Sequence, residues 1–441
     1  MSDSTVSLST SSQRSSVMNS VDMAAKQVLF RTLNNIRTGS IHLVDSGRSH
    51  TFGRTDQRGL CARLEVHNPE FYWRTLFGGS LGAAEAYVRG QWSSDQLVDL
   101  FRIVASDAQL LDGSIPVLSK LMRPVHGLIH CLRRNTRSGS QRNITAHYDL
   151  SNEFYKLFLD ENMMYSSAVF PTEDSTLEHA SRFKNDLICR KLQLKPEDKI
   201  LEIGSGWGGF AIHAAMNYGC HITTTTISDA QFDLANERVR KSGLQDRVSV
   251  IKNDYRDLSG CYDKIVSIEM IEAVGHQYFD TYFRKCSELL KPCGSMLLQA
   301  ITITDQHFER HAKTVDFIKR HIFPGSCLPS VTRICHSLSD VTDLHVQSLR
   351  DIGMDYARTL GEWSHRFVAR LEEVRALGFS DEFIRKWRFY LAYCEAGFRE
   401  RHISNVQMLL TKPQYESVPS SQECQVLGKP VKKNNDPEDS I

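Results

Sequence analysis

The stretch KILEIGSGWGG, residues 199–209, decides the fold, because a short apolar run ends there in a glycine-rich turn. The apolar run is typical of a buried strand, and residues 206–218 continue with apolar side chains at helical spacing. Glycines in such a turn can take positive φ and let a ligand approach the backbone closely. The N-terminus of the following helix favours a carboxylate or a phosphate. The glycine spacing matches neither the GxGxxG motif nor the P-loop motif. The turn therefore predicts a ligand-binding site but does not identify the ligand.

Strands and helices alternate on the C-terminal side of this turn. Short apolar runs bounded by turn residues predict four further strands, at residues 220–228, 248–254, 262–270 and 294–303. Helical periodicity predicts intervening helices at residues 229–243 and 278–292. Such alternation implies right-handed crossovers and a Rossmann-like, doubly wound α/β sheet.

Length and composition indicate a multidomain protein without metal-binding cysteine motifs. A chain of 441 residues predicts two or three domains, and a formal net charge of +1 gives no global field for nucleic acid. The eleven cysteines form no CxxC pair, so we expect reduced thiols and no metal site. We expect a disordered Ser-rich tail at 1–22, a small α+β domain at 23–110, a basic amphipathic linker at 111–142, the α/β domain at 143–412 and a mobile tail at 413–441.

The segment 114–142 combines basic and apolar side chains and contains no acidic residue. Such a pattern is typical of an element that lies on a membrane surface. A linker whose apolar face packs on the next domain would give the same pattern, and the sequence leaves both interpretations open. No apolar run approaches the ~18–20 residues that span a bilayer, so we expect any membrane contact to be peripheral.

Polar residues follow each of the first three strands, at the edge where an open α/β sheet binds its ligand. The acid that often holds a ribose after the second strand is absent, and Gln231 is our candidate for that hydroxyl contact. Ser228 and Asp254 could instead be helix caps. The candidate ligand-binding residues at this edge are Glu202, Gly204, Gly206, Thr226, Ser228, Gln231, Asp254 and Tyr255.

Several long blocks together carry a family resemblance. They are HYDLSNEFYKLFLDENMMYSSAVF (147–170), LEIGSGWGGFA (201–211), YDKIVSIEMIEAVGHQYFDTYF (262–283), IFPGSCLPS (322–330) and GMDYARTL (353–360). In these blocks the chain resembles the cyclopropane-fatty-acyl-phospholipid synthases and the mycolic acid methyltransferases. The residues of the blocks are most similar to those of the eukaryotic branch. The resemblance runs from about residue 143 to 410 and extends into the N-terminal domain through residues 66–87.

The resemblance implies a class I S-adenosylmethionine-dependent methyltransferase. Family members transfer the methyl group to the double bond of an unsaturated acyl chain on a membrane phospholipid. A carbocation forms, and a bound bicarbonate is thought to remove a proton so that a cyclopropane ring closes. The implied protein is cytoplasmic and peripherally membrane-associated, has no nucleic-acid partner and could form a homodimer. Three alternatives stay open: a methyl- or methylene-branched product, N-methylation of a small amine, and a non-catalytic lipid-binding homologue.

The resemblance also assigns roles to residues. It adds Tyr165 and Ser166 to the cofactor contacts, and it places Glu272, Ile301 and Tyr356 around the bicarbonate. Ser167 stands where the bacterial pattern has Cys, and Gln299 stands where that pattern has His. Both replacements keep a hydrogen-bond donor, so the anion site could survive with a different route for the proton. Glu269, three residues before Glu272, is the less favoured candidate for the acidic role.

Overall fold

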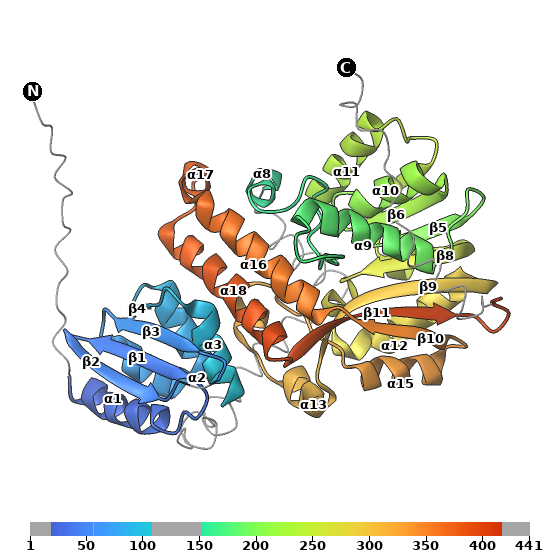
Figure 1. Ribbon diagram of the computed structural model, residues 1–441. Coiled ribbons are helices and arrows are strands. Elements are labelled where there is room, and N and C mark those ends of the chain that lie inside the picture. The colour runs from blue at the N-terminus through green and yellow to red at the C-terminus, as the bar shows by residue number, and fades with distance from the viewer. Residues whose placement is uncertain (1–18, 56, 108–150, 417–441) are drawn as a thin grey trace, which may run out of the picture. The chain divides into compact units, whose positions relative to one another are not determined.

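The computed structural model describes residues 19–55, 57–107 and 151–416, which belong to two compact units. Residues 1–18 of the tail expected at 1–22, residues 417–441 of the tail expected at 413–441, and the basic linker expected at 111–142 lie outside the described residues. Each unit has a sheet of its own (Figure 1).

The N-terminal unit is a small α+β fold around a four-stranded sheet of order β2-β1-β3-β4. Strand β1 pairs antiparallel with β2 and parallel with β3. The first helix begins at Ser20, inside the tail expected at 1–22, because Asn19 and Asp22 form a capping box. The elements are α1 (Ser20–Leu33), β1 (Ser40–Asp45), β2 (Arg48–Gly53), β3 (Cys61–Val66), α2 (Glu70–Val88), β4 (Trp92–Ser93) and α3 (Leu97–Ser106).

The C-terminal unit contains a seven-stranded sheet of order β10-β11-β9-β8-β5-β6-β7. The five strands from β5 to β9 run parallel, and β11 pairs antiparallel with both β9 and β10. The order reverses at β5, so the ligand edge of such a sheet lies at the end of this strand. The strands are β5 (Lys199–Ile203), β6 (His221–Thr226), β7 (Val248–Lys252), β8 (Tyr262–Ile268), β9 (Leu290–Ile303), β10 (His345–Asp351) and β11 (Ile403–Thr411).

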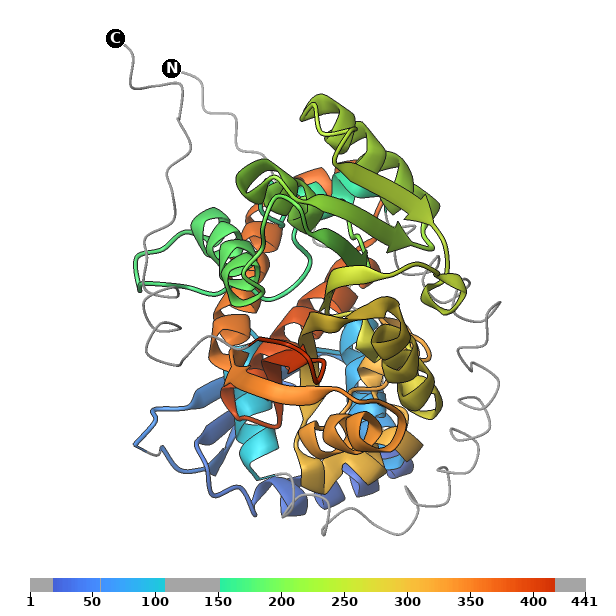
Figure 2. The same ribbon diagram turned by 90° about the vertical axis from the view of Figure 1, so that its right-hand side faces the viewer.

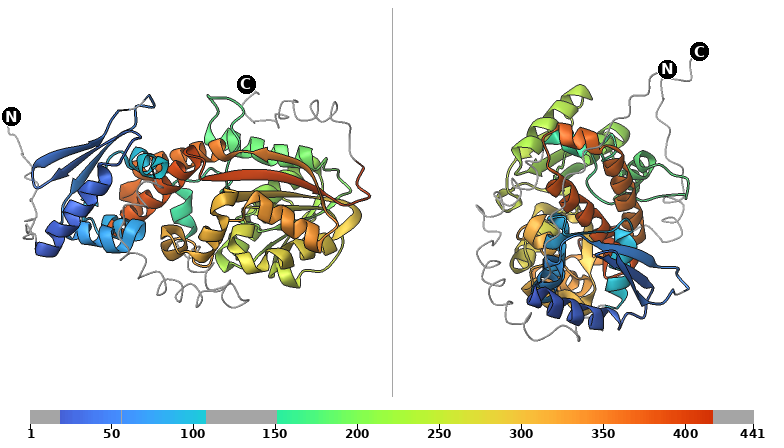
Figure 3. Two further views of the ribbon diagram at one scale, coloured as in Figure 1. Left: turned by 90° about the horizontal axis from the view of Figure 1, so that it is seen from below. Right: turned by 90° about the vertical axis from the view of Figure 1, so that its left-hand side faces the viewer.

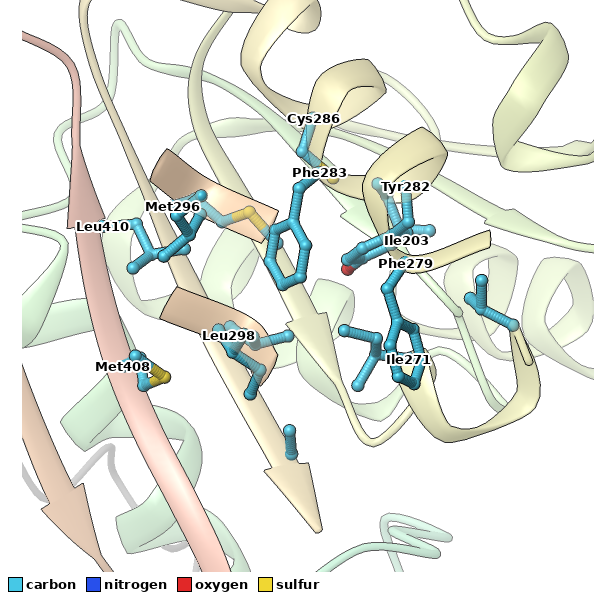
Figure 4. Close-up of a cluster of buried hydrophobic side chains, with 14 of the residues drawn as sticks. Ile203, Ile271, Phe279, Tyr282, Phe283, Cys286, Met296, Leu298, Met408 and Leu410 are labelled. Atoms are coloured by element: carbon cyan, nitrogen blue, oxygen red, sulfur yellow. The ribbon is translucent and has the colours of Figure 1, made fainter. Parts of the chain in front are cut away.

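Helices cover both faces of this sheet, which confirms the predicted doubly wound fold (Figure 3). Helices α9 (Leu177–Lys191), α10 (Gly209–Tyr218) and α11 (Asp229–Lys241) contribute to one apolar core. Helices α12 (Phe279–Leu289) and α15 (Val331–Val341) contribute to the other. Figure 4 shows part of this second core, where Phe283 lies beside Met296 of β9 and Phe279 lies beside Ile271.

The remaining helices of the described C-terminal unit surround the end of the sheet. Helix α16 (Gly353–Ala369) packs side by side with α18 (Asp381–Arg399) (Figures 1 and 2). The sequence pattern does not predict these elements, because the helices and the antiparallel β11 break the simple strand–helix alternation. The other helices are α8 (Asn152–Lys156), α13 (Asp305–Lys313), α14 (Phe317–His321) and α17 (Leu371–Ala376), with 3₁₀ turns η1 (Tyr255–Asp257), η2 (Ile271–Ala273) and η3 (His276–Tyr278).

Strands β9 and β11 present different chemistry on their two faces. Alternate residues such as Met296, Leu298 and Met408 enter the core beneath α12. The intervening positions include Gln299 on β9 and Gln407 on β11, which are paired directly across the two strands. Because successive side chains point to opposite faces, these buried polar groups lie together on the face opposite that core.

No helix among the described residues is both long enough and apolar enough to cross a membrane.

Candidate active site

The glycine-rich turn between β5 and α10 leaves room for a ligand. Gly204 and Gly206 have φ of +98° and +48°, in the left-handed region that favours glycine. A Cβ atom at Gly206 would meet no protein atom within 4 Å, whereas one at Gly204 would lie 3.2 Å from Met270. The turn therefore offers open space beside Gly206, at the N-terminus of α10. The α-carboxylate of a cofactor fits such a place, because unpaired backbone N–H groups point there.

The loop after β6 is organised by its own hydrogen bonds. Ser228 caps helix α11, because its side chain accepts from the Gln231 backbone N–H. Thr226 donates its hydroxyl proton to Gln231 Oε1 over 2.8 Å. That contact leaves the amide Nε2 group as the donor of Gln231 for a ribose hydroxyl. Ser228 is thus a helix cap, as the alternative interpretation had it. Gln231 retains an amide donor that suits the expected contact with a ribose hydroxyl.

The loop after β7 likewise has an internal role for its acid. Asp254 caps η1 by accepting from the Arg256 backbone N–H, and its carboxylate pairs with the Arg256 guanidinium at 2.6 Å. The next residue, Tyr255, packs its ring 5.4 Å from that of Tyr282. In this loop the Tyr255 ring offers a surface on which a planar ligand group could stack. The Asp254 carboxylate is instead paired with Arg256.

Two buried titratable side chains, Glu202 and Lys184, lie close to the turn. Glu202 accepts a 2.6 Å hydrogen bond from the Thr224 hydroxyl, and burial raises the pKa of this carboxyl to about 8. Lys184, on α9, is fully buried and donates to Ser166 Oγ over 3.2 Å. Burial lowers the pKa of Lys184 to about 8, while nearby Glu269, Asp160 and Glu202 oppose that change. Sequence reasoning missed Lys184, because a lysine on a helix is ordinarily expected at the surface.

The carboxylate of Glu269 is the centre of the buried polar network. Its Oε1 accepts from Ser167 N (2.9 Å), Gln299 Nε2 (2.8 Å) and Asn405 Nδ2 (2.6 Å). Its Oε2 accepts from the Tyr356 hydroxyl (2.9 Å). Burial raises the pKa of this carboxyl, and the hydrogen bonds from its donors act in the opposite direction.

A chain of donors fixes the orientation of Gln299. The Lys191 ammonium can only donate, and it donates to Gln407 Oε1 over 2.9 Å. Gln407 Nε2 must then be the donor to Gln299 Oε1, at 3.0 Å. Gln299 consequently presents its NH₂ group, and not its oxygen, to Glu269. The direction of every bond in this chain follows from the cation at its far end.

Glu272 has a different environment from Glu269. Its Oε1 accepts from the backbone N–H of Ile301, and its Oε2 is buried with no hydrogen-bond partner among the described residues. Burial, with a smaller contribution from the neighbouring charge of Glu269, raises the pKa of Glu272 to about 8. At neutral pH this carboxyl is therefore mostly protonated, and it can donate a hydrogen bond.

Most residues that the resemblance placed around a bicarbonate contact Glu269. Tyr356 and Gln299 do so through their side chains, and Ser167 does so through its backbone N–H. The Ser167 hydroxyl donates to the Ala168 carbonyl over 2.9 Å, and its expected donation to an anion stays a prediction. The signal for Glu269 was present in the stretch SIEMIEAVG, where two acids follow a buried strand. Nothing local distinguished one acid from the other.

Aromatic rings enclose the same region. The Tyr356 ring lies 6.1 Å from Trp363 and 4.6 Å from Phe398. The Tyr165 ring lies 5.3 Å from Trp363, and its hydroxyl is 2.9 Å from that of Tyr390. This wall excludes water from the carboxylates, and aromatic faces can stabilise a cation that forms beside them.

The fold and the turn define a class of protein, and comparisons with known proteins define it further. Residues 135–408 match the family model described as mycolic acid cyclopropane synthetase. The chain is 36% identical over 397 residues to tuberculostearic acid methyltransferase UfaA1 of Mycobacterium tuberculosis, covering 88% of this chain and 91% of that protein. It is 37% identical over 357 residues to cyclopropane-fatty-acyl-phospholipid synthase of Escherichia coli, covering 80% and 88%.

Solved structures agree with this assignment. The cyclopropane synthase MmaA2 from Mycobacterium tuberculosis matches with a TM-score of 0.58 and 30% identity, over 62% of this chain and 98% of that one. A structure of the mycolic acid cyclopropane synthase CmaA1 complexed with SAH and CTAB matches with a TM-score of 0.58 and 32% identity, over the same shares. The protein is an S-adenosylmethionine-dependent methyltransferase. It belongs to the mycolic acid cyclopropane synthetase family.

Proposed function

We propose that this enzyme transfers the methyl group of S-adenosylmethionine to a double bond in an acyl chain of a membrane phospholipid and then closes a cyclopropane ring. The observation that carries the proposal is the buried pair of carboxyl groups, Glu269 and Glu272, behind an aromatic wall. Methyl transfer to an alkene followed by ring closure needs both features. Aromatic rings stabilise the carbocation, and a buried base removes a proton afterwards.

The chemistry balances with the residues available. The alkene π electrons form a bond to the methyl carbon, and the sulfonium leaves as neutral S-adenosylhomocysteine. The positive charge moves to the second alkene carbon. A base then takes a proton from the added methyl group, and the C–H electron pair closes the third side of the ring. An alkene is a weak nucleophile, so positioning in a water-free pocket must supply much of the rate.

The cofactor contacts are part of this proposal. We assign the methionine part of S-adenosylmethionine to the turn at Gly204 and Gly206, together with Glu202 and the Tyr165–Ser166 segment. We assign the ribose to Gln231 and the adenine to the neighbourhood of Tyr255. Thr226 and Ser228 shape the loop that holds Gln231, and Asp254 with Arg256 shapes the loop that holds Tyr255.

A branched product is the second candidate, and specific relatives favour it. One relative noted above is a tuberculostearic acid methyltransferase. Another, sphingolipid C9-methyltransferase 1 of Gibberella zeae, is 30% identical over 286 residues, which cover 63% of this chain and 55% of that protein. In a branched product a hydride shift would move the cation before the proton is lost. The first step, and the residues assigned to it, would be the same.

Labelled cofactor distinguishes these products. The full chain is incubated with unsaturated phospholipid vesicles and S-adenosylmethionine that carries a CD₃ group. A cyclopropane and an exocyclic methylene branch each retain two deuterium atoms, whereas an unsaturated methyl branch, which loses its proton from a chain carbon, retains three. Mass spectrometry of the fatty acids gives the count, and NMR separates a ring from an exocyclic methylene. Methylation of added small amines, with no lipid product, would contradict the proposal.

The substrate also implies contact with a membrane. We propose that the protein is cytoplasmic and binds the bilayer peripherally, with the basic segment 114–142 as the contributing element. That segment lies outside the described residues, so the proposal rests on its sequence alone. A homodimer is a further expectation that sedimentation would test.

A further inference from the structure

We propose that the Glu269 carboxylate is itself the base that removes the proton, so that this enzyme works without bicarbonate. The inference rests on the proposed function and deepens it, because it names the acceptor for the step that closes the ring. It would replace a diffusible anion with a side chain built into the fold.

The donors that an anion would need are already in use. Ser167 N, Gln299 Nε2 and the Tyr356 hydroxyl all donate to Glu269. The backbone N–H of Ile301 donates to Glu272. A bicarbonate placed among them would have to displace Glu269, and it would bring a second negative charge beside a buried carboxylate. Both changes are costly where water is excluded.

The distribution of hydrogen bonds indicates which oxygen takes the proton. Three N–H groups converge on Oε1 of Glu269, whereas among the described residues Oε2 accepts only from Tyr356. Oε2 therefore retains a lone pair, and Tyr356 links this oxygen to the aromatic wall. In the proposed step a C–H bond of the added methyl breaks, its electron pair forms the ring bond, and the proton moves to Oε2.

The unpartnered side-chain oxygen of Asn405 supports the assignment of Glu269 as the base. Its amide donates to Glu269, and its own Oδ1 is buried without a hydrogen-bond partner among the described residues. An orphaned buried acceptor destabilises the fold. Turning the amide over would point this oxygen at the carboxylate. The orientation is thus the one that favours the ionised form of Glu269 against the burial that raises its pKa, and it leaves the Asn405 oxygen without a partner among the described residues.

The backbone at Glu269 gives a sharp way to test the idea. Its φ is +51°, in the left-handed region where non-glycine residues are uncommon and often mark functional sites. Glu269→Gly would suit this backbone and would leave a carboxylate-sized space among four donors. Glu269→Gln would keep the volume but remove the basic oxygen. The two variants therefore separate the loss of a base from the loss of packing.

The experiment measures lipid products in carbonate-depleted buffer with the purified full chain, CD₃-labelled cofactor and dioleoyl phosphatidylglycerol vesicles. Wild type should give the same rate with and without 10 mM added bicarbonate. Glu269→Gly should lose about 10²-fold or more of its ring-forming rate and regain at least about tenfold with bicarbonate or formate. Glu269→Gln should lose a similar amount without rescue, because its amide fills the space. Glu309→Gln, an exposed change on α13, is the control and should match wild type.

Each outcome bears on one of the two proposals. In Glu269→Gln the release of S-adenosylhomocysteine should fall less than ring formation, because methyl transfer precedes proton removal. A purely structural role would lower both equally, and calorimetry with S-adenosylhomocysteine shows whether the variants still bind cofactor. A wild type that makes rings only with bicarbonate, or a fully active Glu269→Gln, overturns the inference alone. A wild type that makes no lipid product under any condition overturns the proposed function, and the inference with it.

Discussion

Glu269 and Glu272 are three residues apart, yet their surroundings prepare them for different roles. Burial raises the pKa of both carboxyls, but Glu269 also accepts from four donors, which favour its ionised form. Glu272 has one backbone donor and an unpartnered oxygen, and its pKa is raised to about 8 by burial and by Glu269. Two neighbouring carboxyls in such environments are a familiar arrangement for one base and one neutral acid. We therefore expect Glu272 to orient the reacting groups as a hydrogen-bond donor.

Glu272→Gln tests this role. An amide keeps the acceptor for Ile301 N and also keeps a donor, so cofactor affinity should change little. Turnover should fall, by up to about 10²-fold, if the acid proton itself is needed during the reaction. Steady-state kinetics with the product assay and calorimetry with S-adenosylhomocysteine give the two quantities. An unchanged kcat would show that a donor at this position suffices and that the acid proton of Glu272 is not transferred.

The raised pKa of Glu272 also predicts a pH dependence of stability. Between the ordinary value of 4.5 and about 8, the folded protein holds a proton that the unfolded chain releases. Stability must therefore fall as pH rises through this window. Glu272→Gln removes that contribution, so its melting temperature relative to wild type should be higher at pH 8 than at pH 5. Scanning calorimetry at the two values measures the difference, and an equal offset at both would contradict the raised pKa.

At the scale of elements, the turn between β5 and α10 offers the most direct test of the proposed cofactor site. A Cβ atom at Gly206 would touch no protein atom within 4 Å, so it would enter only the space assigned to the cofactor. Gly243, after α11, has a similar φ of +65° and also meets nothing within 4 Å. It is a matched control for backbone strain without a ligand nearby.

Gly206→Ala should weaken S-adenosylhomocysteine binding at least about tenfold, because a methyl group would occupy the place of close backbone approach. Gly243→Ala should leave that affinity unchanged. Both variants should lose a similar amount of stability, about 1–2 kcal/mol, from an alanine in the left-handed region. Calorimetric titration and chemical unfolding measure these effects. Equal affinities for the two variants would remove the turn from the cofactor site.

At the scale of the whole molecule, the substrate is presented in a bilayer and the enzyme has to reach it. Arg133, Arg134 and Arg137 belong to the basic segment, and each such residue near an anionic surface contributes about 1 kcal/mol. Replacing all three by Gln should weaken sedimentation with anionic vesicles, most strongly at low salt. Neutral vesicles provide the control. Identical binding by both proteins at every salt concentration would leave the segment as a linker.

The sequence alone determined the doubly wound sheet, the glycine turn and the class of cofactor. The sheet and the turn follow from local rules, namely periodicities of 2 and 3.6 and a turn whose φ only glycine adopts easily. The class of cofactor follows from the family resemblance. Ser167, Gln299 and Tyr356, which contact Glu269, were also recognisable through a resemblance carried by long blocks. What stayed ambiguous was the choice between two acids in SIEMIEAVG, because both follow the same strand.

Only the tertiary structure decided between those acids. Strand β11 enters antiparallel beside β9, more than a hundred residues after the acids, and it supplies Asn405 and Gln407. Helix α9 supplies Lys191 at the far end of the same hydrogen-bond chain. The state of a buried carboxyl depends on which donors surround it, and here those donors come from segments that are distant in the sequence. No local pattern in the sequence carries that information.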